Sequence, residues 1–102
     1  MDRWTMAQIR ACNRERGQHW FERGTMRFFN SRVGRSVYQG PGGVYFVSSE
    51  KFEPSSGPAF PRKYSVRKFN PKDCSVDTVG DFQRFGFEHA AADEAKRLAR
   101  GR

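Results

Sequence analysis

The sequence predicts an α+β fold, in which an antiparallel sheet of about four to five strands carries an N-terminal and a C-terminal helix packed on one face. Three observations lead to this prediction. Helix signals mark both ends of the chain, runs rich in Val, Tyr and Phe lie between them, and Gly/Pro clusters separate those runs. The 102 residues have the length of one domain, which we place at 1–102.

The first helix is predicted to begin after Thr5, whose hydroxyl accepts a hydrogen bond from the first turn, with Gln8 at the capping-box spacing. Ile9 and Cys12, three residues apart, give a narrow apolar stripe. Gly17 is a natural C-terminal stop. The His-Trp-Phe run at 19–21 is interpreted as an aromatic plug or a second short helical turn.

Strand-like segments follow at 25–33, 36–39, 44–49, 63–70 and 75–79. The Gly/Pro cluster at 40–43 predicts a hairpin, because glycine adopts the positive φ that tight turns require. Asn-Pro-Lys-Asp at 70–73 is typical of a turn. The Pro-rich stretch 53–62 lacks periodicity and is predicted to be a loop, the best candidate for a mobile segment.

The last helix is predicted from about Glu88 to Arg100, because this segment is rich in alanine. Ala91, Ala95 and Leu98 share one side of it, and its acidic residues come early and its basic residues late, which suits the helix dipole. Hairpin-connected strands make an antiparallel sheet, and two helices most simply cover one face of it.

The composition predicts an aromatic core and an anionic partner. The chain has 10 Phe, 3 Tyr and 2 Trp but a single Leu and a single Ile, so rings must fill most of the core. Its net charge of +8 predicts a partner of opposite sign, an acidic protein surface or nucleic acid. Arginine outnumbers lysine 14 to 5, and its planar fork suits phosphates and carboxylates. A GC-rich genome would also explain this ratio, although not the net charge.

The sequence gives little support for catalysis. Two cysteines, Cys12 and Cys74, are too few for a disulfide framework or a metal cage, and we expect free thiols unless the fold brings them together. His19 and His89 have no Cys, Asp or Glu at metal-ligand spacing, and there is no Gly-rich phosphate loop followed by Lys-Ser/Thr. We therefore predict no enzyme activity, catalytic residue, metal or cofactor. The enzyme alternative would depend on one of these four side chains.

The location predicted is the cytoplasm, without a membrane partner. No apolar run approaches the roughly 20 residues that a membrane span needs. The first residues lack the apolar core of a signal peptide. The oligomeric state is left open.

Positive charge concentrates in two segments. Residues 1–35 hold eight arginines against three acids, and residues 61–87 hold six basic against three acidic residues. If these segments are neighbours, they form one basic face that makes charge-assisted bonds to phosphates or carboxylates. The candidate contacts are Arg10, Arg14, Arg27, Arg32, Arg35 and Arg67.

Aromatic residues interleaved with this charge could stack on unpaired bases. Because Leu and Ile are so scarce, most of these rings are expected to be core. The stacking candidates are Phe28, Phe29, Tyr45, Phe46, Tyr64 and Phe69.

The middle of the chain resembles small uncharacterised proteins of phages and mobile elements. The resemblance covers roughly residues 19–99 and rests on the runs MRFFNSRV, VYFVSSEKF, YSVRKFNP and SVDTVGDFQRFGF, followed by the Ala-rich helix. The stretch 53–62 is longer here than that pattern leads us to expect. The resemblance implies an early or accessory phage gene acting in the host cytoplasm, and it assigns no site residues.

These observations leave three hypotheses open. The first is a small basic phage-type binding protein that inhibits or modulates a host nucleoprotein complex, with an anti-CRISPR-like inhibitor as the specific form. The alternative is a stand-alone DNA- or RNA-binding protein, whose affinity would fall steeply with salt. A structural module would instead self-associate through the edge of its sheet.

Overall fold

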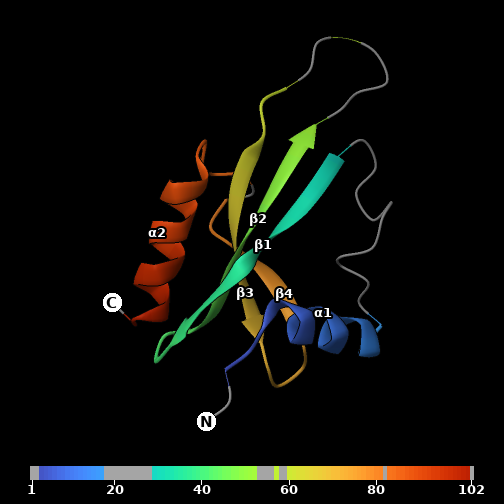
Figure 1. Cartoon of the computed structure of the whole chain (residues 1–102), viewed down its shortest axis with the longest axis vertical. Helices are drawn as coiled ribbons and strands as arrows, with labels where there is room; N and C mark the ends of the chain where they lie inside the picture. Colours follow the sequence, from blue (N-terminus) through green and yellow to red (C-terminus); the bar gives the residue numbers. More distant parts are fainter. Residues whose placement is uncertain (1–2, 18–28, 53–56, 58–59, 82, 102) are drawn as a thin grey trace.

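A computed structural model describes residues 3–17, 29–52, 57, 60–81 and 83–101. In this part of the chain four strands form one antiparallel sheet in the order β1-β2-β3-β4, with a helix before and after it (Figure 1). The predicted α+β class is confirmed. The elements are α1 (Met6–Glu15), β1 (Phe29–Gly40), β2 (Gly43–Phe52), β3 (Lys63–Asn70), β4 (Ser75–Val79) and α2 (Glu88–Ala99).

Helix α1 begins as the sequence predicts. The Thr5 hydroxyl accepts a hydrogen bond from the backbone N–H of Gln8 (3.2 Å), and the Gln8 side chain accepts one from the N–H of Thr5 (3.0 Å), which completes the capping box. Gly17, with φ of +74°, follows the end of the helix. The aromatic run 19–21 and residues 25–28 of the first predicted strand lie outside the described residues.

Strand β1 is one long strand where the sequence predicts two. Its pairing with β2 shifts between Val33 and Val37, so the extra residues at 34–36 form an irregularity within a continuous strand. A bulge of this kind is defined by how two strands pair. The residue pattern of one strand alone does not show that pairing. Strand β2 is longer than the predicted 44–49, whereas β3 and β4 have their predicted bounds.

The two helices lie on opposite faces of the sheet (Figure 1). Tyr45 and Val47 of β2 pack against buried alanines of α2. Phe46, between them, points to the other face and packs with Phe69 of β3 and Ile9 of α1. This corrects the prediction that both helices cover one face. The run 44–47 is apolar on both sides of its strand, and such a strand needs cover on both faces.

A disulfide between Cys12 and Cys74 ties α1 to the turn between β3 and β4, with the two Cα atoms 5.5 Å apart. Beside it, Asn13 Nδ2 donates a hydrogen bond to the carbonyl oxygen of Cys74 (3.0 Å). The expectation of free thiols is therefore wrong, because the fold brings two distant cysteines together.

The β1–β2 turn is docked on the end of α2. The backbone N–H of Gly42 donates to the carbonyl oxygen of Ala99 (2.9 Å). A Cβ atom at Gly42 would collide with the carbonyl oxygen of Leu98, so only glycine permits this approach. The contact fixes the C-terminal end of α2 against the end of β1. No helix in the described ranges is long and apolar enough to cross a membrane.

Candidate anion-binding pocket

A pocket of about 190 Å³ opens on the α2 side of the sheet, between β1, β2, the start of β3 and the first residue of α2. Arg32 of β1 pairs with Ser49 of β2, and Ser49 pairs with Tyr64 of β3. Residues paired directly across antiparallel strands have their side chains on the same face. The three side chains therefore form one row across the sheet, and this row is the floor of what we call the arginine pocket.

Two further charged side chains complete the arginine pocket. Arg62 comes two residues before Tyr64, and its Nη1 donates a hydrogen bond to the hydroxyl of Ser49 (2.9 Å). Glu88 is brought to the pocket by backbone pairing, because Tyr64 and Phe85 exchange N–H···O bonds of 2.8 and 3.0 Å just before α2 begins. The pocket therefore depends on the sheet and on the start of α2, not on a loop alone.

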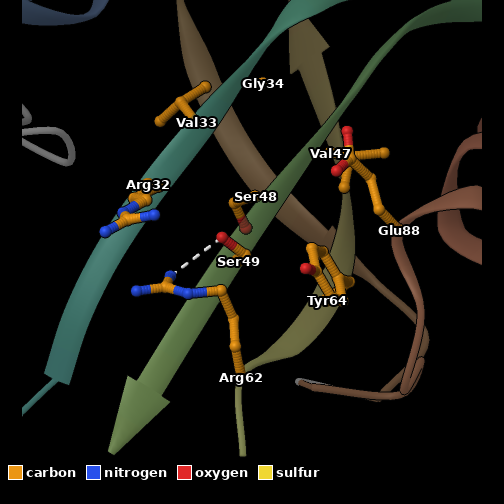
Figure 2. Close-up of a pocket in the computed structure, with 9 residues that line it drawn as sticks. All are labelled: Arg32, Val33, Gly34, Val47, Ser48, Ser49, Arg62, Tyr64 and Glu88. Carbon is orange, nitrogen blue, oxygen red and sulfur yellow. Dashed lines mark hydrogen bonds between the residues drawn. The ribbon is translucent and has the colours of Figure 1, made fainter.

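The charges in the arginine pocket are separated. Figure 2 shows the guanidinium groups of Arg32 and Arg62 at one end and the Glu88 carboxylate at the other. Arg32 is exposed and Arg62 half-buried. Guanidinium groups bind phosphate or carboxylate oxygens in pairs of parallel hydrogen bonds, whereas an ionised carboxylate only accepts hydrogen bonds. The arrangement fits a ligand with an anion at one end and an amine or hydroxyl at the other.

The serines of the arginine pocket are bonded to arginines. Ser49 accepts from Arg62, and Ser48 accepts from Nε of Arg67 (2.8 Å). A guanidinium does not lose its proton in a protein, so neither partner can act as the general base that activates a serine nucleophile. Within the described residues, no group of three or more His, Cys, Asp or Glu side chains could hold a metal ion.

Behind Ser48 lies a buried polar network on the α1 side of the sheet. Arg67 is 4% exposed and its Nη2 is 3.5 Å from the carboxylate of Glu50, which is fully buried. Arg67 also donates to the Thr78 hydroxyl, and Ser65 donates to Glu50 (3.2 Å). Burial lowers the pKa of Arg67, and the nearby Glu50 carboxylate partly opposes that shift.

The six predicted arginines do not form one face. Arg32 lines the arginine pocket, and Arg35 is exposed in the irregular part of β1. Arg10 and Arg14 are exposed on α1, across the sheet from the pocket. Arg27 lies outside the described residues. Arg67 is buried and ion-paired, which removes it from the surface that a partner could reach.

The predicted stacking residues are mainly core. Tyr45, Phe46 and Phe69 are buried, and Tyr64 is half-buried in the arginine pocket. Nothing is described for Phe28 or for the side chain of Phe29. Two rings that the sequence did not single out, Phe60 and Phe87, are exposed. Phe87, the residue before α2, is 68% exposed and stacks on His89 with ring centroids 5.7 Å apart.

Sequence reasoning also missed Arg62 and Ser49. Arg62 falls at the end of the predicted loop 53–62, although its spacing of two from Tyr64 places both on one face of an extended chain. The sequence identifies Glu88 only as an early acidic residue of the last helix, where it suits the helix dipole. The spacing signal for Arg62 was present, but the pairing that joins it to Arg32 requires the sheet register.

The chain belongs to a family of unknown function (DUF7447), whose sequence model matches residues 5–96. The match includes Arg32, Ser49, Arg62, Tyr64 and Glu88, all the residues that define the arginine pocket. No curated protein and no solved structure matches the chain.

Proposed function

We propose that this member of a family without an assigned function is a non-catalytic protein that binds single-stranded nucleic acid, with Arg32 and Arg62 holding a phosphate. The observation that carries the proposal is the charge separation in the arginine pocket: two guanidinium groups from neighbouring strands at one end and the Glu88 carboxylate at the other. The net charge of +8 supports it, because basic charge draws a polyanion to the surface.

A nucleotide has the groups that this pocket would recognise. Its phosphate matches the two arginines, and its sugar hydroxyls or base amino groups can donate to Glu88. Phe87, the neighbour of Glu88, presents an exposed ring on which a base can stack. Only unpaired bases offer their faces for stacking on such a ring, which favours a single strand over a duplex.

Inhibition of a host nucleoprotein, including the anti-CRISPR-like form, stays a prediction. It would use the same arginines to bind phosphates or carboxylates of the partner. Phage origin is equally a prediction from resemblance. The Cys12–Cys74 disulfide weighs against the predicted cytoplasmic location, because disulfides are rare in a reducing cytosol.

The test is fluorescence anisotropy with labelled 12-nucleotide single-stranded DNA and RNA and with a duplex of the same sequence. We expect the single strands to bind more tightly than the duplex. The double variant Arg32→Gln/Arg62→Gln should bind the single strands at least about tenfold more weakly, which is about 1.4 kcal/mol.

The matched control is Arg16→Gln/Lys72→Gln. It removes the same charge from exposed positions at the α1 end of the molecule, and it should bind almost as the wild type does. Circular dichroism would verify that both variants fold. If the wild type binds no bare nucleic acid, the proposal fails and the host-nucleoprotein hypothesis takes its place. Equal losses in the two variants would show attraction by net charge alone and contradict a site at the pocket.

A further inference from the structure

A second pocket, of about 300 Å³, lies between β1 and the other end of α2. Arg3, Lys96 and Arg100 line it, and none of the described residues in its lining is acidic. We call it the terminal pocket, because these cations come from the chain before α1 and from the last turn and C-cap of α2. A concave site with three cations and no carboxylate fits an oxyanion such as a phosphodiester.

The fold holds the parts of the terminal pocket in place. Trp4, next to Arg3, is fixed to β1 by two reciprocal hydrogen bonds with the Gln39 side chain, of 2.8 and 2.9 Å. Lys96 has its Nζ 5.8 Å from the centre of the Tyr38 ring. Arg100 follows the end of α2, which the docked turn at Gly42 fixes. The segments that carry Arg3 and Arg100 are therefore held against β1 and its turn by hydrogen bonds.

The two pockets lie beside the same two elements, β1 and α2, at opposite ends of them. The arginine pocket takes residues from 32–34 of β1 and the first residue of α2, and the terminal pocket takes 37–41 and residues 96–100. Strand β1 and helix α2 therefore run in the same direction past both pockets. From residue 88 to residue 100 an α-helix rises about 18 Å, which is about five nucleotides of a stacked strand. Arg35 is exposed on β1 between the two.

We propose that the arginine pocket and the terminal pocket are the two ends of one binding groove between β1 and α2, along which the backbone of a single nucleic-acid strand lies. A phosphate held by Arg3, Lys96 and Arg100 is about five nucleotides from the phosphate held by Arg32 and Arg62. This inference rests on the proposed function and adds to it the length and the path of the bound strand. A span of this length is within the range of about 4–16 nucleotides for single-strand-binding modules.

The test compares two oligonucleotide lengths on one variant. Arg3→Gln/Arg100→Gln should bind a single-stranded 12-mer at least about tenfold more weakly than the wild type does, because the far phosphate contact is lost. A trinucleotide is too short to reach from one pocket to the other, so the variant should lose only the trinucleotide binding at the terminal pocket and keep the binding at the arginine pocket. NMR titration would measure the weaker trinucleotide binding. Arg16→Gln/Lys72→Gln is again the charge-matched control.

The outcomes separate this inference from the proposed function. If Arg3→Gln/Arg100→Gln keeps wild-type affinity for the 12-mer while Arg32→Gln/Arg62→Gln loses it, the groove is wrong and the proposed function stands. If the wild type binds neither oligonucleotide, both fail. If poly-glutamate displaces the 12-mer as well as unlabelled 12-mer does, the groove takes acidic polymers in general and the assignment to nucleic acid is overturned. NMR signals shifted by the 12-mer at both ends of α2 would support the groove without any substitution.

Discussion

At the scale of single residues, the contrast between Arg67 and Arg32 shows what decides the role of an arginine. Both lie on strands, but Arg67 points to the α1 side, where it is 4% exposed and paired with Glu50, whereas Arg32 is exposed on the α2 side. A buried charge persists only when it is paired and hydrogen-bonded. Arg67 therefore stabilises the fold, and Arg32 is available to a ligand.

Replacing Arg67 by methionine should lower the free energy of unfolding by about 3–5 kcal/mol, because it leaves the Glu50 carboxylate buried without its cation. Urea denaturation would measure the change. The double variant Arg67→Met/Glu50→Leu removes both charges and should recover most of the loss. A single variant as stable as the wild type would show that the buried carboxylate does not depend on this arginine.

The sequence predicts the alternation that sends Arg67 and Lys68 to opposite faces, but not that the Arg67 face is buried. In the run KYSVRKFN at 63–70, apolar and polar residues occur on both faces of the strand. The alternation therefore does not show which face is buried. The buried partner of Arg67 is on β2, 17 residues earlier. Such a pair is visible only when the register of the sheet is known.

At the scale of elements, the sequence predicts the bounds of a helix or strand correctly where residues within or beside that segment determine its ends. The capping box at Thr5 and Gln8, the alanine-rich helix α2 and the bounds of β3 and β4 all follow from residues within or beside each element. The continuous β1 and the placement of the two helices did not follow, because they depend on contacts with other elements. The run 44–47, apolar on both sides, was the available sign that two layers cover the sheet.

The element most dependent on a distant contact is α1, which the Cys12–Cys74 disulfide joins to the sheet across 62 residues of sequence. Reduction should lower the free energy of unfolding by about 2–4 kcal/mol, because the unfolded chain regains the freedom of a long closed loop. Urea denaturation with and without dithiothreitol would measure the effect.

The variant Cys12→Ser/Cys74→Ser is the control for reduction, and its stability should not respond to dithiothreitol. Affinity for a trinucleotide should stay unchanged in native, reduced protein, since α1 and the arginine pocket lie on opposite faces of the sheet. Equal stability of the oxidised and reduced wild type would show that the disulfide is not a structural tether.

At the scale of the whole molecule, the sequence predicts a basic binding protein. Its prediction that the arginines form one basic face is wrong. The arginines expected on one face are divided, with Arg10 and Arg14 on α1 and Arg32 across the sheet. The candidate groove instead combines residues from five regions of the sequence, at positions 3, 32–41, 47–49, 62–64 and 88–100. Net charge is a property of the composition, whereas its position on the surface is set by topology.

The most direct test of the central claim is the salt dependence of binding to a single-stranded 12-mer. The phosphate held by Arg32 and Arg62 and the phosphate held by Arg3, Lys96 and Arg100 predict a slope of log Kobs against log salt of about −1.4, since each neutralised phosphate of a single strand contributes about −0.7. Affinity should then fall by about sevenfold between 50 and 200 mM salt. A slope near zero, or no binding at about 50 mM salt, would contradict the account.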